Sequence, residues 1–503
     1  MTATLTRPVA STLRVGRSRG PLTLAGVAFL LYSAFSWLQW SSYISPSYDL
    51  GIFSQIADRY AHFEAPVVTI LGEDFNALGD HFHPLLILLG PVYALFPTPF
   101  SLLVVQNLLF AVSVYVVTRF AMGELGRTSG LLLGGAYALS WGLQSAVEAQ
   151  FHAISLAVPL LALAIVALLS RRWWWAAVLV MPLVFVKEDL GLTVALFGLI
   201  LAVQWRSWWG LGVLVWGAGW FLLTVLVLIP ALNPEGDWSQ GSKLGLSGLF
   251  NDPGTFFQLP KLMTIALLLL VTLGIGLTSP VYLLVLPTLA WRFLGDNPYF
   301  WGHFWQYSAV LMPIVFLAAV DTLAKRRGGE SEPLTSVLED RGASREVVVL
   351  PGARSGSSGA PAPRSSRTRV HWSGAERVQM GLCAGMLLVA IGVTLQMPLG
   401  KLLFPGDHFR ADARASAEAA LSKITVGSVV ETDHILMNYL VSRHRVYHIG
   451  TKDNPVPDYF VLALYDPDAE PRTAELQAEA WHAGHDYRTI HTDTYFQVAR
   501  RVD

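Results

Sequence analysis

The sequence has little charge and almost no cysteine. Only 14% of its 503 residues are charged, whereas a soluble protein carries about 25%. The one cysteine, Cys383, lies in an apolar run, which excludes an intrachain disulfide and any zinc or redox site built on cysteines. A net charge of −1 gives no reason to expect nucleic acid or another polyanion as a partner.

Apolar and aromatic residues take the place of the missing charge. Hydrophobic residues make up 53% of the chain, which contains 17 Trp and 25 Phe. The mean hydropathy of +0.46 describes a chain that mostly faces lipid. This composition excludes an ordinary soluble enzyme and a disordered protein, and it predicts a polytopic α-helical membrane protein.

Charge-free windows predict the membrane spans, because about 20 apolar residues cross a bilayer. The window 262–291 has 30 uncharged residues, and we interpret it as two spans hinged near Pro280. We therefore expect eleven spans. The windows are 21–40, 100–118, 128–147, 153–170, 173–186, 190–205, 207–230, 262–291, 304–320 and 378–400.

The basic residues predict the orientation, since short cytoplasmic loops are enriched in Lys and Arg. With residues 1–20 in the cytoplasm, every basic cluster between spans also falls inside. The apolar segment 84–96 is expected to lie on the outer membrane surface, because counting it as a span would export two of these clusters. The clusters are Arg119 with Arg127, Arg171 with Arg172, Arg206, and Lys325 to Arg327.

This topology divides the chain into five parts. The cytoplasmic N-terminus, 1–20, precedes a transmembrane core, 21–324, with a large first outer loop at 41–99. A Ser-, Gly-, Pro- and Arg-rich stretch, 325–377, is predicted to be a disordered basic cytoplasmic linker. The last span, 378–400, exports the tail 401–503.

The exported tail is predicted to be a small α/β domain, because charges return and apolar residues alternate. Strands separated by helices indicate three layers. No glycine-rich phosphate loop is present, so nucleotide binding is not indicated. Strands are expected at 426–432, 445–449, 458–464, 486–492 and 494–500, and helices at 407–424, 433–444 and 473–484.

Polar residues beside membrane spans mark function more often than not, and here they gather on the outward side. Asp49, nine residues after the first span, precedes an apolar run and Gln55. Its alternative role is a helix N-cap, which does not exclude catalysis. The motif GDHFHP contains His81 and His83, which in an extended stretch share one face. They could ligate a metal or clamp a phosphate, or they could simply bind lipid headgroups.

Two further groups of polar residues also lie on the outward side. Glu148 and His152 are four residues apart and, on a helix, would let a carboxylate orient an imidazole; a solvated turn is the alternative. The triplet Lys187, Glu188 and Asp189 separates two windows that are short for full spans. We expect these three charges to lie in a cavity, where buried charges need partners.

Arg292 and His303 flank a further segment at the outward end of the predicted spans, either as part of the site or as interface anchors.

The order of these motifs resembles the bacterial and archaeal "domain of unknown function 2079" membrane-protein family. The resemblance covers most of the chain outside the linker. The family more typically has His-Tyr where this chain has His303 and Phe304. The matching segments are YDLGIFSQ, GDHFHPLL, EAQFHAISLAVPLLALA, VKEDLGL, GHFWQYSAVLMP and the tail pattern GSVVETDHILMNYLVSRHRVY with DYFVLAL.

That layout in turn resembles the GT-C glycosyltransferases, which transfer a sugar from a polyprenyl-phosphate carrier to an acceptor outside the cytoplasm. The resemblance gives Asp49 the position of their loop carboxylate and places Lys187 near the donor phosphate. Either Asp49 or Glu188 is the expected catalytic carboxylate. The remaining candidates for binding donor or substrate are Gln55, His81, His83, Glu148, His152, Asp189 and His303.

The predicted function is therefore an integral plasma-membrane glycosyltransferase, inverting, that uses a polyprenyl-phosphate sugar donor and an extracytoplasmic acceptor. Membrane lipids are the other partners. No cofactor is required, but a divalent cation, Mg²⁺ or Mn²⁺, could bind among Asp49, His81 and His83. Two other classes remain open: a transporter or flippase of envelope precursors, and a non-catalytic envelope assembly protein. Charged residues gather at only one end of the predicted spans, and no internal sequence repeat is evident. Both observations favour an enzyme over a transporter.

Overall fold

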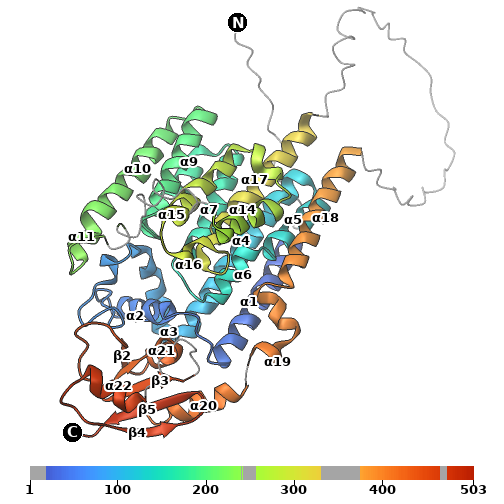
Figure 1. The fold of residues 1–503 in the computed structure, drawn as a ribbon. Helices are drawn as coiled ribbons and strands as arrows, with labels where there is room; N and C mark the ends of the chain where they lie inside the picture. The colour runs from blue at the N-terminus through green and yellow to red at the C-terminus, as the bar shows by residue number, and fades with distance from the viewer. Residues whose placement is uncertain (1–18, 239–240, 242–256, 330–373, 410, 465–472) are drawn as a thin grey trace, which may run out of the picture.

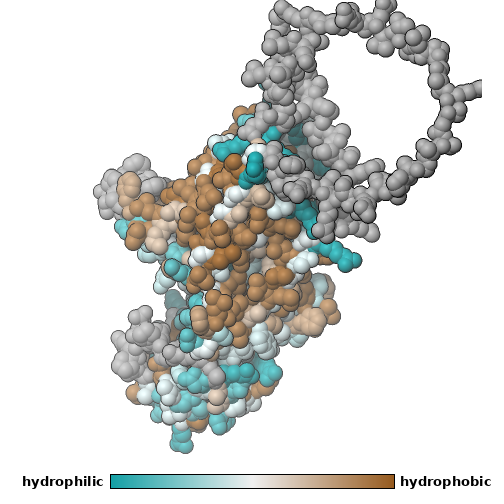
Figure 2. Space-filling view, turned by 90° about the vertical axis from the view of Figure 1, so that its right-hand side faces the viewer, coloured by the Kyte–Doolittle hydropathy of each residue, from teal (hydrophilic) through white to brown (hydrophobic). Residues whose placement is uncertain are grey.

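The computed structural model describes residues 19–238, 241, 257–329, 374–409, 411–464 and 473–503. A bundle of helices forms one part, and a small α/β domain built from the tail forms the other (Figure 1). Hydrophobic residues dominate the surface of the helical part, whereas the tail domain is largely hydrophilic (Figure 2). This division agrees with a membrane-embedded core that bears a water-exposed domain.

The helical part follows the apolar windows. Proline opens α1 and α4 within the first two helical positions, where its missing N–H is tolerated. The helices are α1 (Gly20–Ser41), α2 (Asp49–Ala61), η1 (Ala77–Gly79), η2 (Pro84–Leu89), α3 (Gly90–Leu95), α4 (Pro99–Leu125), α5 (Arg127–Ala138), α6 (Trp141–Glu148), α7 (Ile154–Leu169), α8 (Trp173–Val180), η3 (Met181–Phe185), α9 (Leu190–Gln204), α10 (Trp209–Leu223), the π-helical η4 (Thr224–Leu228), α11 (Ile229–Leu232), α14 (Leu259–Leu270), η6 (Ile275–Thr278), η7 (Pro280–Leu284), α15 (Val285–Leu294), α16 (Pro298–Trp301), η8 (Gln306–Ser308), α17 (Leu311–Gly329), α18 (Gly374–Thr394), η9 (Pro398–Leu403) and α19 (Pro405–His408).

Within the described residues, four helical segments are long and apolar enough to cross a membrane: Gly20–Ser41, Pro99–Leu125, Trp209–Leu232 and Gly374–Thr394. A fifth is a pair bent by 66°, Pro298–Ser308 with Leu311–Arg327. The windows 153–170, 173–186, 190–205 and 262–291 form shorter apolar helices of 10–17 residues. The protein is thus a helical membrane protein, and the count of eleven spans stays a prediction.

Three windows differ from simple spans. The window 128–147 is broken at Ser140, which is extended (φ −64°, ψ 137°) between α5 and α6. The window 304–320 becomes helical at η8 and then α17, which begins only at Leu311. The window 262–291 breaks between α14 and η7, as the expected hinge near Pro280 requires. The expected linker 325–377 and the N-terminus 1–20 lie mostly outside the described residues.

Small residues bring α9 and α10 into close contact. A Cβ added at Gly198 would lie 2.3 Å from the backbone nitrogen of Leu214, and one at Gly217 would lie 2.4 Å from that of Ala195. Only glycine allows two helix backbones to approach so closely, and such packing is a usual means of association between membrane helices. The pair α9–α10 therefore forms a rigid unit.

The first outer loop fills the space between the helical part and the tail domain. It contains α2, η2 and α3 (Figure 1). Leu86, Leu89 and Tyr93 are buried, whereas Ile87 and Leu88 are exposed. This amphipathic pattern fits the expected position of segment 84–96 on the membrane surface.

The tail folds into a five-stranded sheet in the order β2-β1-β3-β5-β4. Strands β1, β2 and β3 are parallel, and β5 is antiparallel to both β3 and β4. Helix α22 packs on one face, whereas α20 and α21 lie on the other, so the predicted three layers are present. The elements are α20 (Ala411–Leu421), β1 (Val429–Thr432), α21 (His434–Leu440), β2 (Arg445–His448), β3 (Tyr459–Ala463), α22 (Ala474–Trp481), β4 (Tyr487–Thr492) and β5 (Phe496–Arg501).

Candidate functional site

Asp49 and His152 form the first contact of the site. Asp49 is the first residue of α2, whose N-cap is Tyr48, so the alternative role of Asp49 as an N-cap is not found. Its Oδ2 lies 3.5 Å from Nε2 of His152, with 36% of the Asp49 side chain exposed and 8% of His152. Burial raises the pKa of Asp49, but the His152 ring and the Ser47 hydroxyl more than offset this and lower it overall. Asp49 is therefore an ionised, accessible carboxylate.

Glu188 and His81 form a second carboxylate–imidazole pair. Nδ1 of His81 lies 2.7 Å from Oε1 of Glu188, and the backbone N–H of Phe82 donates to Oε2 at 3.1 Å. Burial opposes ionisation of Glu188, but His81 outweighs it and lowers the pKa of Glu188 to about 2. Burial also opposes the charge on His81, yet Glu188 raises the pKa of that imidazole. The fold thus joins GDHFHP and the Lys187–Asp189 turn.

His83 is separated from this pair. The segment between η1 and η2 is not extended, so His81 and His83 do not share a strand face as expected. His83 is buried, and its ring lies 6.0 Å from that of Phe53. Burial lowers the pKa of His83 to about 4, which keeps it neutral at physiological pH. Among the residues that the structure describes, no group of three or more His, Cys, Asp or Glu side chains could hold a metal.

Lys187 is the cation of the site. Its Nζ lies 3.5 Å from Oδ1 of Asp189 and 4.9 Å from the centre of the Trp291 ring. Burial opposes its charge, but Asp189 and Glu188 outweigh that effect and raise its pKa. Burial raises the pKa of Asp189. As expected from the short flanking helices, the three charges between η3 and α9 are largely buried, and Lys187 stays protonated.

Tyr307 and Arg292 complete the site; the sequence pattern singles out Arg292 but not Tyr307. The Tyr307 ring lies 5.6 Å from that of Trp291 and 5.7 Å from the guanidinium of Arg292. Its hydroxyl is near enough to Asp49 and Lys187 for their charges to act on it. No signal in the sequence distinguishes Tyr307 from other interfacial tyrosines, although it lies in the quoted GHFWQYSAVLMP motif.

Arg292 holds this part of the site together. It is fully buried, and it donates to the carbonyls of Phe300 and Gly302 and to the Ser308 hydroxyl. A buried guanidinium with every bond made to one loop is structural. It fixes the loop that presents Tyr307 to the site.

The expected helical pairing of Glu148 with His152 is absent from the structure. Glu148 and His152 do not share a helical face, because Gln150 adopts a left-handed backbone (φ 70°) after α6 and turns the chain. Glu148 instead pairs with Lys401. Gln55 faces away from the charges and binds Thr69 and the carbonyl of Val446.

His303 has an apolar environment rather than a charged partner. Its ring lies 6.2 Å from that of Trp141 and 4.0 Å from that of Phe304. The side chain of Phe304, at the position where a tyrosine is more typical, is 63% exposed. In this chain, the same loop instead supplies the hydroxyl of Tyr307 to the charged site.

Some polar atoms of the cluster make no hydrogen bond within the described residues. His83 Nδ1 is buried without one, and His152 Nε2 and Asp189 Oδ1 each make only an ion pair at 3.5 Å. These atoms keep bonding capacity that a ligand could use. Cations, carboxylates and free acceptors in one place suit a phosphate and a hydroxyl-bearing substrate.

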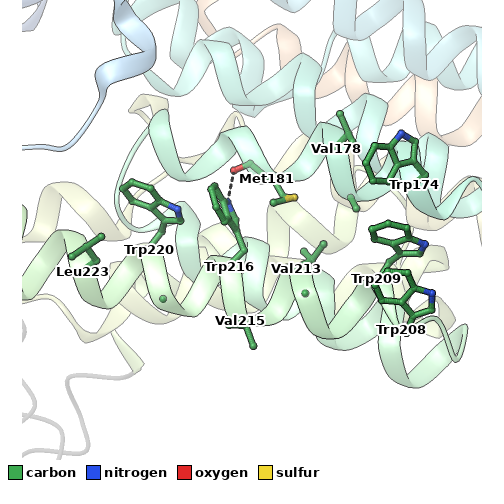
Figure 3. A pocket seen from close by; sticks show the side chains of 13 residues that line it. Trp174, Val178, Met181, Trp208, Trp209, Val213, Val215, Trp216, Trp220 and Leu223 are labelled. Carbon is green, nitrogen blue, oxygen red and sulfur yellow. Dashed lines mark hydrogen bonds between the residues drawn. The ribbon is translucent and has the colours of Figure 1, made fainter.

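A long apolar groove ends beside these charges. It has a volume of about 540 Å³ and lies between α8–η3 and α10. Trp174 and Trp209 lie at one end, Trp220 and Leu223 lie at the other, and Trp216 lies between them (Figure 3). Trp216 is fixed by a 3.2 Å hydrogen bond from its Nε1 to the carbonyl of Met181.

Phe82 links one wall of the groove to the charged cluster. The Trp220 ring stacks on Phe82 with centroids 6.3 Å apart, and the Phe82 backbone N–H binds Glu188. Gly212 and Gly219 leave the groove open, because a Cβ added at either would meet no atom within 4 Å. The apolar lining fits a hydrocarbon chain.

Comparisons with known proteins give the family of this chain and its fold. Residues 41–339, more than half of the chain, match a family model described as "Predicted membrane protein (DUF2079)". No curated protein matches the sequence.

Two solved structures of ArnT from Cupriavidus metallidurans are similar in fold. The structure bound to undecaprenyl phosphate gives a TM-score of 0.56 at 13% identity, and covers 95% of this chain and 97% of that chain. The apo structure gives 0.55 at 12% identity with the same coverage. The likeness confirms the expected resemblance to the GT-C glycosyltransferases at the level of the fold.

Proposed function

This chain belongs to the DUF2079 family of predicted membrane proteins, and from its GT-C-like fold and charged cluster we propose that it is a membrane glycosyltransferase. Its donor is a sugar linked to polyprenyl phosphate, and its acceptor is a glycan, lipid or protein outside the cytoplasm. The observation that carries the proposal is the meeting of Asp49, Lys187 and the His81–Glu188 pair at one end of an apolar groove.

The chemistry is a single displacement. The acceptor hydroxyl oxygen attacks the anomeric carbon, the bond from that carbon to the phosphate oxygen breaks, and polyprenyl phosphate leaves. Asp49 takes the hydroxyl proton as general base, which suits an ionised and accessible carboxylate. Lys187 and protonated His81 stabilise the charge that develops on the leaving phosphate. Attack from the face opposite the leaving group inverts the anomeric centre.

The donor chain occupies the groove between α8–η3 and α10. The 15 residues of α10 span about 22 Å at 1.5 Å per residue, so several isoprene units fit along it. Undecaprenyl phosphate is bound by the similar ArnT structure, which supports a carrier of this class.

Several finer features stay predictions. These are the eleven spans, the inward N-terminus and the outward tail. A divalent cation also stays a prediction, but the described residues supply no three-ligand set for one. We therefore assign no step to a metal, and charge stabilisation rests on Lys187 and His81.

The direct test supplies purified protein with polyprenyl-phosphate sugars and an envelope acceptor fraction. We expect labelled sugar to move to the acceptor and free polyprenyl phosphate to be released in equal amount. Movement of the intact lipid-linked sugar across a vesicle membrane without its cleavage would contradict the proposal, and would favour a flippase.

Filling the groove should make the enzyme discriminate against long-chain donors. In Gly219→Leu the new side chain projects into open space on α10, so the fold is retained. The KM for a full-length donor should rise roughly tenfold or more, which corresponds to about 1.4 kcal/mol of lost binding. A short, water-soluble donor with two isoprene units should be used as well as by the wild type. Steady-state kinetics with both donors measures the difference.

The matched control is Gly392→Leu. Gly392 lies on α18, and a Cβ there also meets no atom within 4 Å, but it is far from the groove lining. Equal effects of both variants, or equal loss with both donor lengths, would show that the groove does not hold the chain.

A further inference from the structure

The tail domain reaches into the site through one helix, α21. Its residue Asn438 is fully buried, 0% exposed, where α21 packs on α2. A buried amide on a domain surface needs specific partners. Those partners come from the helical part rather than from the tail domain.

Asn438 binds the segments that precede both members of the Asp49–His152 pair. Its Nδ2 donates to Ser45 Oγ at 3.0 Å, to the Ser47 carbonyl at 3.3 Å and to Gln150 Oε1 at 3.3 Å. Ser47 is two residues before Asp49, and its hydroxyl accepts from the Asp49 N–H at 3.3 Å.

The second segment, which contains Gln150, contacts His152 as the Ser47 segment contacts Asp49. Gln150 is two residues before His152, and its carbonyl oxygen lies 3.2 Å from Nδ1 of that imidazole. Gln150 holds a left-handed backbone (φ 70°), a conformation that persists only when surrounding contacts over-determine it. Its side chain is held by Asn438 and also donates to the Ile44 carbonyl at 3.2 Å.

The surface of α2 is shaped to admit this side chain. A Cβ on Gly51 would lie 3.1 Å from Oδ1 of Asn438 and 3.0 Å from Cδ1 of Ile70. The neighbouring Tyr439 donates from its hydroxyl to the Trp40 carbonyl at 3.0 Å. The tail helix is therefore fixed at both sides of Asn438, close to α2.

We propose that Asn438 is a positioning residue that sets Asp49 against His152, so that the tail domain completes the active site. The inference rests on the proposed function, because it assigns the tail a part in that same reaction. One amide joins two segments about 100 residues apart in sequence, each two residues from one member of the Asp49–His152 pair. Catalytic geometry is sensitive to such supports, since a misplacement of about 1 Å can lower a rate by about 10².

Asn438→Leu in the full-length protein is the test. The substitution keeps the branched shape, removes the bonds and deprives the Ser47 carbonyl and Oε1 of Gln150 of this donor. We expect kcat to fall by about 10². The donor KM should stay within a few fold, because within the described residues the hydrogen bonds of Asn438 go to Ser45, Ser47 and Gln150 rather than to Lys187 or the groove lining.

Two comparisons separate positioning from mere stability of the tail. Asn454→Leu removes an equivalent amide of the same domain, which binds Glu431 and the His448 carbonyl, and should leave kcat near wild type. Gly51→Ala pushes α21 away from the other side of the contact and should lower kcat as Asn438→Leu does. Equal loss of kcat in Asn454→Leu and Asn438→Leu would overturn the proposal.

Hydrogen exchange gives a readout that does not depend on sugar transfer. Asn438→Leu should speed amide exchange in peptides 43–50 and 148–153 together, with exchange in β3 and β5 unchanged. Unchanged exchange in either segment would overturn the proposal, whatever the activity. If the exchange result holds while the wild type transfers no sugar, the coupling stands and the proposed function fails. If the wild type transfers sugar and Asn438→Leu keeps its kcat, the function stands and this inference fails.

Discussion

Asp49→Asn is expected to yield a folded, donor-binding protein whose kcat is lower by about 10²–10⁴, the usual loss when a general base is removed. The amide keeps the shape of the side chain and its place at the start of α2. It cannot accept the proton of the acceptor hydroxyl. Because Tyr48 is the N-cap of α2, loss of the carboxylate should change the melting temperature little. Single-turnover kinetics with a labelled lipid-linked sugar measures the loss.

The control for this variant is Asp58→Asn on the same helix, where the carboxylate is 52% exposed and distant from the cluster. It should keep wild-type turnover. If Asp49→Asn retains turnover within a few fold whereas Glu188→Gln does not, the base is Glu188. The roles of the two carboxylate–imidazole pairs would then be exchanged.

The pH profile gives a second check on Asp49. A general base works only when ionised, and the pKa of Asp49 lies below its ordinary value. Activity should therefore persist as the pH falls, and its acidic limb should lie below about pH 3.9, the ordinary pKa of an aspartate. An acidic limb near pH 6 would instead indicate that loss of an unprotonated histidine limits turnover.

Lys187→Met should be the most damaging change to donor use. It keeps the stem of the side chain against Trp291 but removes the cation that the donor phosphate would meet. Removing a preorganised charge donor from a developing anion typically lowers kcat by about 10²–10³. The donor KM should rise as well, because the ground-state phosphate is also charged. Kinetics at varied donor concentration separates the two effects.

Lys401→Met is the matched control for that variant. Lys401 is also paired with a carboxylate, that of Glu148, but the pair is more exposed, at 39% and 24%. A surface ion pair contributes only about 0–1 kcal/mol, so this variant should behave as the wild type. If both lysine variants lose activity equally, the effect is one of overall charge rather than of a phosphate contact at Lys187.

The sequence determined the class of the protein and most of its elements. Lipid-facing helices need long apolar windows, and a two-residue alternation specifies strands, so both could be predicted from local pattern. The five strands and three layers of the tail followed in this way. The buried triplet Lys187 to Asp189 was also evident, because charges between short apolar segments have no other explanation.

The partners of the charged residues were not predictable, because they come from distant segments. The pairing of Asp49 with His152 depends on the turn at Gln150, and that of His81 with Glu188 joins residues 107 positions apart. Local spacing instead suggested that Glu148 lies beside His152, which a single left-handed residue prevents.

Only the tertiary structure decided which polar residues belong to the site. Tyr307 enters it because buried Arg292 holds the loop around it, and Asn438 reaches it because the tail packs on α2. Neither residue has a distinctive local pattern, since an aromatic or an amide is common at any interface. The sequence specifies where the helices and strands form, but side chains far apart in the chain meet only when those elements pack together.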